Sequence, residues 1–248
     1  MQIISYGTTL TGSTGVNGDS YYISPDNKVF VLSDGASGAG KNGKVIMSST
    51  CAEIAKQYDY SSSNLAPEDY VDVLFWKINN KLIELSQNNR NRLYGTIIIA
   101  VIDKDILTVT TFGDSPIFLF SDGKTKRIAK NKKRYEDMIE QGFITKDEYE
   151  GYIKQMHPRM GACFDYFLPE VVPNNVIEQY SLTKSDIVFM CCDGLSDWVT
   201  PENILTALNE YGIENGVQNL VSNAKELSLR NDNYYDDITA IAIHYSYI

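Results

Sequence analysis

Short apolar segments that run directly into aspartate limit what this chain can fold into more than any other feature of its sequence. The segments are rich in Val, Ile, Thr and aromatic residues, as β-strands are. Aspartate accompanies several of them, at Asp34–Gly35, Gly113–Asp114, Asp193–Gly194 and, just before the segment 238–245, at Asp236. A strand followed by glycine holds a carboxylate rigidly at a sheet edge and lets the backbone approach a ligand. The sequence therefore predicts carboxylates gathered at the ends of strands.

Asp-Gly pairs are also ordinary turn sequences, and a single pair indicates nothing more. Asp122–Gly123 is interpreted in this way, as a hairpin turn with no further role. The recurrence of the pattern, with Asp197 one turn after Asp193, favours a functional cluster. Carboxylates that gather without Arg or Lys nearby repel one another and need cations. Ligand sets made only of oxygen select Mg²⁺ or Mn²⁺ over zinc.

Two such ions can share one bridging carboxylate and one bridging water. They lower the pKa of that water, which supplies a hydroxide nucleophile near neutral pH, and they stabilise the charge on a transferring phosphoryl group. The carboxylate pattern thus predicts metal-assisted hydrolysis, with phosphoesters as the favoured substrates.

The order of the elements predicts antiparallel sheets covered by helices in one domain, residues 1–248. Hairpins are expected across Asp103–Lys104 and across Ser115–Pro116. Apolar periodicity, with a start signal at Thr200–Pro201, predicts helices over 43–57, 67–86, 200–208 and 216–229. The polar, charged segment 130–168 interrupts the strands and is interpreted as an inserted flap.

Composition excludes several classes of function. A formal net charge of −10 argues against a nucleic-acid partner, because binding phosphates needs clustered Lys and Arg. The 4 cysteines have no metal-ligand spacing, so free buried thiols are expected, and 2 histidines are too few for a His-rich metal centre. No apolar stretch can span a bilayer and no signal peptide is evident, so a cytoplasmic monomer with no membrane contact is expected.

The order and spacing of the motifs resemble those of the PPM (type 2C) serine/threonine protein phosphatases over nearly the whole chain. The segment 140–145 and His157-Pro158-Arg159 resemble the flap of bacterial members. The other motifs that carry the resemblance are Asn17-Gly18-Asp19, 31–35, Tyr94-Gly95-Thr96, Gly113-Asp114-Ser115, 192–197 and 236–239. The resemblance implies an α+β fold, a four-layer α–β–β–α sandwich of two antiparallel sheets flanked by helices, that removes phosphate from phosphoserine and phosphothreonine of proteins.

The resemblance also assigns roles to the aspartates. Asp34 would bridge two Mg²⁺ or Mn²⁺ ions, and Gly35 would offer its carbonyl oxygen to the site. Asp19 would orient metal-bound water without holding a metal itself. The acids that complete the ligand set would be Asp193 and Asp236 for the two ions, and Asp114 and Asp197 for a third, weaker ion.

Several positions depart from the family pattern. Gly18 stands where members often carry an acid, and the stretch 13–16 lacks the arginine that often grips the substrate phosphate. Ala36 replaces a histidine of the animal enzymes, and Pro116 replaces a common arginine. Metal binding is therefore better supported than phosphate binding. The substitutes considered for the phosphate grip are Arg159 and the basic residues of 126–134.

Two other functions fit parts of the sequence. The segment 38–44, Gly-Ala-Gly-Lys-Asn-Gly-Lys, has most of a P-loop, but Val45 stands where a Ser or Thr would hold Mg²⁺. The chain also lacks the alternating strands and helices of that fold. The stronger alternative is a regulatory pseudophosphatase that has lost the phosphate grip, although every metal-ligand position is still an acid.

Overall fold

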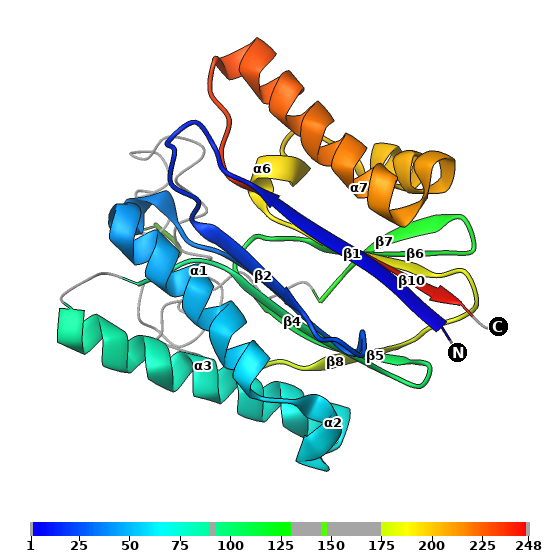
Figure 1. Cartoon of the computed structure of the whole chain (residues 1–248), viewed down its shortest axis with the longest axis horizontal. Helices are drawn as coiled ribbons and strands as arrows, with labels where there is room; N and C mark the ends of the chain where they lie inside the picture. The colour runs from blue at the N-terminus through cyan, green and yellow to red at the C-terminus, as the bar shows by residue number, and fades with distance from the viewer. Residues whose placement is uncertain (1, 90–92, 130–144, 148–174, 247–248) are drawn as a thin grey trace.

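The computed structural model describes residues 2–89, 93–129, 145–147 and 175–246. These residues form two five-stranded antiparallel sheets that pack face to face, with helices on both outer sides (Figure 1). Three apolar clusters fill the spaces between the four layers. The α–β–β–α sandwich that the sequence predicts is confirmed.

Each sheet joins consecutive strands to strands from elsewhere in the chain. One has the order β1-β10-β9-β6-β7, with β1 (Gln2–Leu10), β6 (Ile117–Ser121), β7 (Lys124–Ile128), β9 (Ile187–Cys191) and β10 (Ile238–Ser246). The other has the order β2-β3-β4-β5-β8, with β2 (Asp19–Ile23), β3 (Val29–Asp34), β4 (Ile97–Asp103), β5 (Ile106–Phe112) and β8 (Glu178–Ser181). Every described pairing is antiparallel, which is incompatible with a P-loop fold.

Strand β4 explains why several strands read as unbroken apolar runs. Ile97 and Ile99 belong to the cluster between their sheet and the helices, whereas Ile98 and Ala100 belong to the cluster between the two sheets. Successive side chains of a strand point to opposite faces, and both faces of this sheet are covered. Alternation of polar and apolar residues is therefore lost in the inner strands.

The helices confirm the predicted periodicity with small shifts of their ends. Helices α1 (Gly40–Gln57) and α3 (Pro67–Asn89) cover the sheet of β2, and α7 (Pro201–Asp232) covers the sheet of β1 (Figure 1). The Thr200 side chain accepts a hydrogen bond from the Asn203 N–H and so caps α7. Gly212, at φ 78°, kinks α7 between the two predicted helices. The short elements η1 (Ser37–Ala39), α2 (Tyr60–Ser63), α6 (Asp193–Ser196) and strand β8 were not predicted.

The hairpin expected across Ser115–Pro116 is wrong, because β5 and β6 lie in different sheets. The chain turns out of β5 at Gly113, at φ 94°, and crosses to the other sheet. There the Pro116 carbonyl accepts a hydrogen bond from the Cys191 N–H of β9. The hairpin across Asp103–Lys104 is confirmed as the β4–β5 pair, and Asp122–Gly123 forms the turn between β6 and β7.

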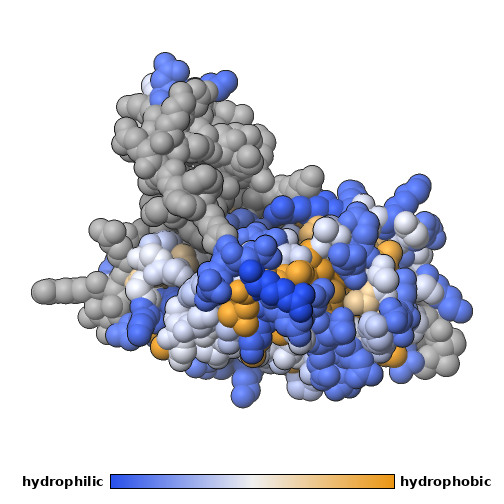
Figure 2. Space-filling view, turned by 90° about the horizontal axis from the view of Figure 1, so that it is seen from above, coloured by the Kyte–Doolittle hydropathy of each residue, from blue (hydrophilic) through white to orange (hydrophobic). Residues whose placement is uncertain are grey.

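The described residues also bear on other expectations. Cys51, Cys191 and Cys192 are buried and free, as predicted, whereas Cys163 lies outside the described residues. The expected flap also lies outside them, except for 145–147. Among the helices that the structure describes, none is both long and apolar enough to cross a bilayer. The face in Figure 2 is mainly hydrophilic around a small apolar area.

Candidate metal centre

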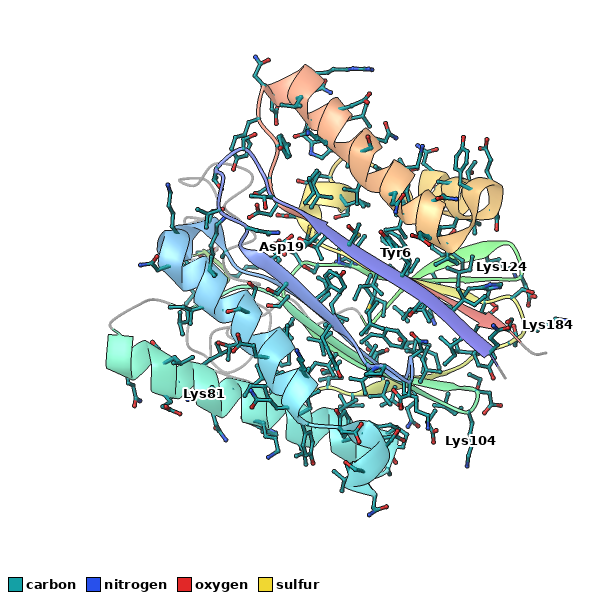
Figure 3. All side chains as sticks on the ribbon, in the orientation of Figure 1. Tyr6, Asp19, Lys81, Lys104, Lys124 and Lys184 are labelled. Carbon is teal, nitrogen blue, oxygen red and sulfur yellow. The ribbon has the colours of Figure 1, made fainter. Side chains whose placement is uncertain are left out.

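The predicted site residues come from the ends of elements in both sheets. Asp34 is the last residue of β3 and lies directly opposite Asp19, the first residue of β2, across an antiparallel ladder. Asp193 opens α6 immediately after β9, Asp236 stands just before β10, and Asp114 lies in the connection from β5 to β6. Asp19 opens its strand at the boundary between the two sheets (Figure 3).

Asp34 lies at the electrostatic centre of this group. Burial raises the pKa of the Asp34 carboxyl well above its ordinary value, and the neighbouring negative charges raise it further. Those charges belong to Asp19, Asp193, Asp114 and Asp236. The fold therefore brings together five of the six predicted carboxylates, with Asp34, which the family resemblance assigns to both ions, among the other four. Such a group needs either bound protons or a cation to offset its charge.

Asp193 shows the same effect and adds the sixth carboxylate. Burial, followed by the charges of Asp114, Asp236 and Asp197, raises the pKa of Asp193 to about 8. Asp197 stays close because its N–H donates to the Asp193 carbonyl, 2.9 Å away, at the end of α6. Both acids predicted for a third ion thus lie within electrostatic reach of Asp193.

Metal-free Asp193→Asn protein is expected to gain stability relative to wild type as the pH rises from 5 to 8. In wild type the Asp193 carboxyl has a raised pKa in the folded state, so its protonation stabilises the folded state at low pH. This stability is lost between the unfolded value, about 4, and the folded value, about 8. We expect the variant to gain about 1–3 kcal/mol of stability relative to wild type, which is part of what a four-unit pKa shift corresponds to. This gain is several degrees in Tm. Calorimetry in EDTA measures the difference in Tm, and a difference independent of pH would contradict the expectation.

The donor set fits hard divalent cations with few protein ligands each. No three His, Cys, Asp or Glu side chains within the described ranges form a ready-made metal cage. Mg²⁺ keeps several waters and binds through one or two carboxylates, so a cage of that kind is not required. Asp34, Asp193 and Asp236 would supply such ions with oxygen atoms alone.

Asp19 is fixed in orientation by a chain of hydroxyl groups. The Thr239 hydroxyl donates to Asp19 Oδ2 at 2.8 Å, so its oxygen accepts the proton of the Thr9 hydroxyl, 2.7 Å away. The Asn17 amide in turn donates to the Thr9 hydroxyl at 2.8 Å. Burial raises the pKa of Asp19 to about 6, against the lowering effect of the Thr239 hydrogen bond. This arrangement suits a carboxyl that orients water beside a metal.

The glycines that follow Asp34 and Asp193 have a structural role that the sequence did not reveal. A Cβ atom on Gly35 would lie 2.0 Å from the Lys44 carbonyl oxygen, and one on Gly194 would lie 2.1 Å from the Asp237 carbonyl oxygen. Real Cβ atoms do not come so close to the backbone. Both glycines are therefore required by close backbone packing, whether or not the Gly35 carbonyl also binds a metal.

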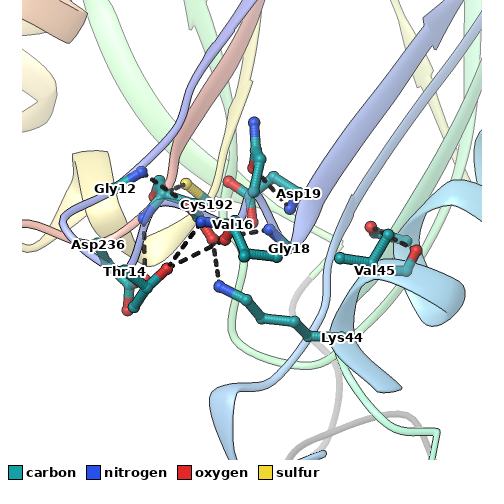
Figure 4. A network of polar contacts seen from close by, with 12 residues as sticks. Gly12, Thr14, Val16, Gly18, Asp19, Lys44, Val45, Cys192 and Asp236 are labelled. Carbon is teal, nitrogen blue, oxygen red and sulfur yellow. Dashed lines mark hydrogen bonds and ion pairs between the residues drawn. The ribbon is translucent and has the colours of Figure 1, made fainter. Parts of the chain in front are cut away.

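A buried lysine beside the cluster corrects the expectation that no Lys or Arg is near. Lys44 Nζ lies 2.7 Å from Asp237 Oδ2, and each side chain is only 4% exposed. Asp237 Oδ1 accepts the Gly12 N–H and Oδ2 accepts the Gly18 N–H, both at 2.7 Å (Figure 4). The one sign of this lysine in the sequence was Gly18, at a position where family members often carry an acid. The Lys44 side chain occupies the space next to Gly18.

A second cation approaches from β7. One Arg127 nitrogen donates to the Asp114 carbonyl oxygen at 3.0 Å. Arg127 belongs to the basic segment 126–134 that was considered for the phosphate grip, and the contact places it at the Asp114 end of the cluster. Arg159 lies outside the described residues.

Comparison with known proteins bears on the fold. No family model and no curated protein matches the sequence. The serine/threonine phosphatase PstP/Ppp of Mycobacterium tuberculosis matches in structure with a TM-score of 0.78 and 19% identity, over 99% of both chains. The catalytic domain of PstP in complex with two manganese ions matches at 0.77 and 18% over 99% of each. The S. agalactiae serine/threonine phosphatase matches with a TM-score of 0.74 and 20% identity, over 99% of this chain and 100% of that one. These likenesses show the fold.

Proposed function

We propose that this chain hydrolyses phosphoserine and phosphothreonine in proteins, with a water activated by two Mg²⁺ or Mn²⁺ ions as the nucleophile. The observation that carries the proposal is the group of carboxylates around Asp34. Burial raises the pKa of Asp34, and the charges of four neighbouring acids raise it further. The group lies in a fold whose structural neighbours are serine/threonine phosphatases, one of them in complex with two manganese ions.

Each residue has a defined task in this proposal. Asp34, Asp193 and Asp236, with the Gly35 carbonyl, would hold the two ions. Bound ions supply a water of lowered pKa and stabilise charge on the phosphoryl group.

Thr239 holds the Asp19 carboxyl through Oδ2, and Asp19 would accept a hydrogen bond from the attacking water. Asp114 and Asp197 would hold a third ion. Arg127 is our candidate for contact with the substrate phosphate, because it is a cation already held at Asp114.

The decisive experiment measures hydrolysis of p-nitrophenyl phosphate and of a phosphothreonine peptide by the wild-type protein, in Mn²⁺ and in EDTA. We expect turnover in Mn²⁺ at least ~10²-fold above that in EDTA, because the nucleophile depends on the ions. A phosphotyrosine peptide of the same sequence is the matched control and should be hydrolysed more slowly.

A regulatory pseudophosphatase is the second candidate, favoured by Ala36 and by the absence of arginine from 13–16. It would bind Mn²⁺, measurable by calorimetry, without hydrolysing either ester. The same pair of measurements therefore separates the two functions. The cytoplasmic location and the monomeric state stay predictions, and size-exclusion chromatography with light scattering checks the second.

A further inference from the structure

We propose that the buried Lys44–Asp237 ion pair sets the affinity of the centre for divalent cations, with Lys44 as a positioning residue that balances charge. This inference rests on the proposed metal site. It concerns two residues to which the proposed mechanism assigns no contact with metal or substrate.

The pair is built into the backbone around the site. Asp237 receives three donors, the Gly12 and Gly18 N–H groups and the Lys44 ammonium, each at 2.7 Å. These donors leave its carboxylate little capacity for a metal, although it directly follows Asp236. The two adjacent acids are thereby given different tasks: Asp237 ties the segment 12–18 to β10, and Asp236 is left for the ion.

Gly18 and Lys44 form a matched set. A Cβ atom on Gly18 would lie 2.5 Å from Lys44 Cδ, so a side chain at position 18 would collide with the lysine. An acid at that position and a lysine at position 44 therefore exclude each other in this conformation. The chain has a cation where an acid would otherwise add to the negative charge of the cluster.

The ammonium of Lys44 acts on more than its partner. Burial alone would lower the pKa of Lys44, but the hydrogen bond and charge of Asp237, with the charges of Asp236 and Asp19, raise it. The same interactions work in the other direction, because the ammonium reduces the negative potential that a metal meets at Asp236. Salt screens buried charges little, so removing the single positive charge of Lys44 should change the electrostatic potential at the metal site.

A charge-balancing role predicts opposite effects from the two halves of the pair. Lys44→Gln keeps a donor for Asp237 and removes the positive charge, so we expect it to tighten Mn²⁺ binding by roughly tenfold. Asp237→Asn leaves the ammonium unbalanced and should weaken binding by roughly tenfold. In the double variant the two charges are removed together, and the Kd should return to within about threefold of wild type.

The measurement is the Mn²⁺ Kd, from the electron paramagnetic resonance signal of free Mn²⁺ at fixed ionic strength. Lys41→Gln is the matched control, since Lys41 is exposed on the same helix one turn earlier and its loss changes net charge equally. It should leave the Kd unchanged. Thermal unfolding in EDTA verifies that each variant folds, and Lys44→Met, which retains the side-chain length, replaces Lys44→Gln if that variant does not.

The outcomes separate this inference from the proposed function. If wild type binds Mn²⁺ but loss of the Lys44 charge leaves the Kd unchanged or weakens binding, the pair is only structural and the inference fails. If wild type binds no Mn²⁺ at millimolar concentration, the metal centre fails and the inference fails with it. Tighter binding by folded Lys44→Gln, with restoration in the double variant, supports the charge-balancing role.

Discussion

Asp193→Asn is expected to lower kcat/KM for p-nitrophenyl phosphate in Mn²⁺ by on the order of 10³-fold, about 4 kcal/mol of transition-state stabilisation. The amide keeps the size of the side chain but removes the negative charge that the ion needs. The charges around Asp193 come from Asp114, Asp236, Asp197 and Asp19, and the proposed mechanism assigns each of these acids another task at the site. Steady-state kinetics, with Mn²⁺ varied at each substrate concentration, measures the loss.

Asp122→Asn is the matched control for this loss. Asp122 precedes glycine after an apolar strand, as Asp34 does, but it lies in the β6–β7 turn at φ 50°. Asparagine accepts that conformation readily, so neither activity nor stability should change. Activity in Asp193→Asn that equals wild type would remove Asp193 from the metal centre. Equal losses in both variants would show that the assay reports folding.

Gly35→Ala is expected to destabilise the protein by about 3 kcal/mol and to abolish metal-dependent activity in the fraction that folds. The added methyl group would lie 2.0 Å from the Lys44 carbonyl oxygen, which is backbone of α1. Helix α1 also carries the buried Met47 and Cys51. It cannot move away from β3 without disturbing that cluster. Urea unfolding measures the free energy, and the loss corresponds to about 6–12 °C in Tm.

Gly38→Ala is the control in the same loop. A Cβ atom on Gly38 would meet the Tyr94 hydroxyl, the tip of a side chain, at 2.1 Å. A tyrosine ring can shift where a helix backbone cannot, so the cost should be about 1 kcal/mol or less. If Gly35→Ala proved no worse than Gly38→Ala, the close packing of α1 on β3 would not be the reason for glycine at position 35.

Local pattern was enough to predict most strands and helices. The residues of β4 are apolar on both faces and those of α3 repeat at helical spacing, so each element was recognisable without its neighbours. The crossing from β5 to β6 could not be recognised in this way, because Ser115–Pro116 resembles a hairpin connection. The turn at Gly113 and the bond from Cys191 to the Pro116 carbonyl send the chain to the other sheet instead.

The sequence likewise predicted some features of the candidate site and missed others. The aspartates at strand ends could be found from the sequence, because an apolar strand followed by Asp-Gly is a local signal. Their convergence was inferred from the recurrence of that signal, and their individual roles only from the family resemblance. The packing reason for Gly35 and Gly194 was missed, since both contacts are with the backbone of other segments, α1 for Gly35 and the residue before β10 for Gly194.

The sequence by itself determined the aspartates and the strands that hold them, and it predicted the hard-cation chemistry of an all-oxygen ligand set. Only the tertiary structure decided which charges face one another. Lys44 and Asp237 are 193 residues apart, and nothing near either residue in the chain indicates the other. Strands can be predicted from short stretches of sequence, because residue propensity and the alternation of side chains are local properties. The Lys44–Asp237 ion pair depends instead on how α1, β10 and the segment 12–18 pack together. The carboxylates at the strand ends are thus accompanied by a buried cation that appeared only in the folded chain.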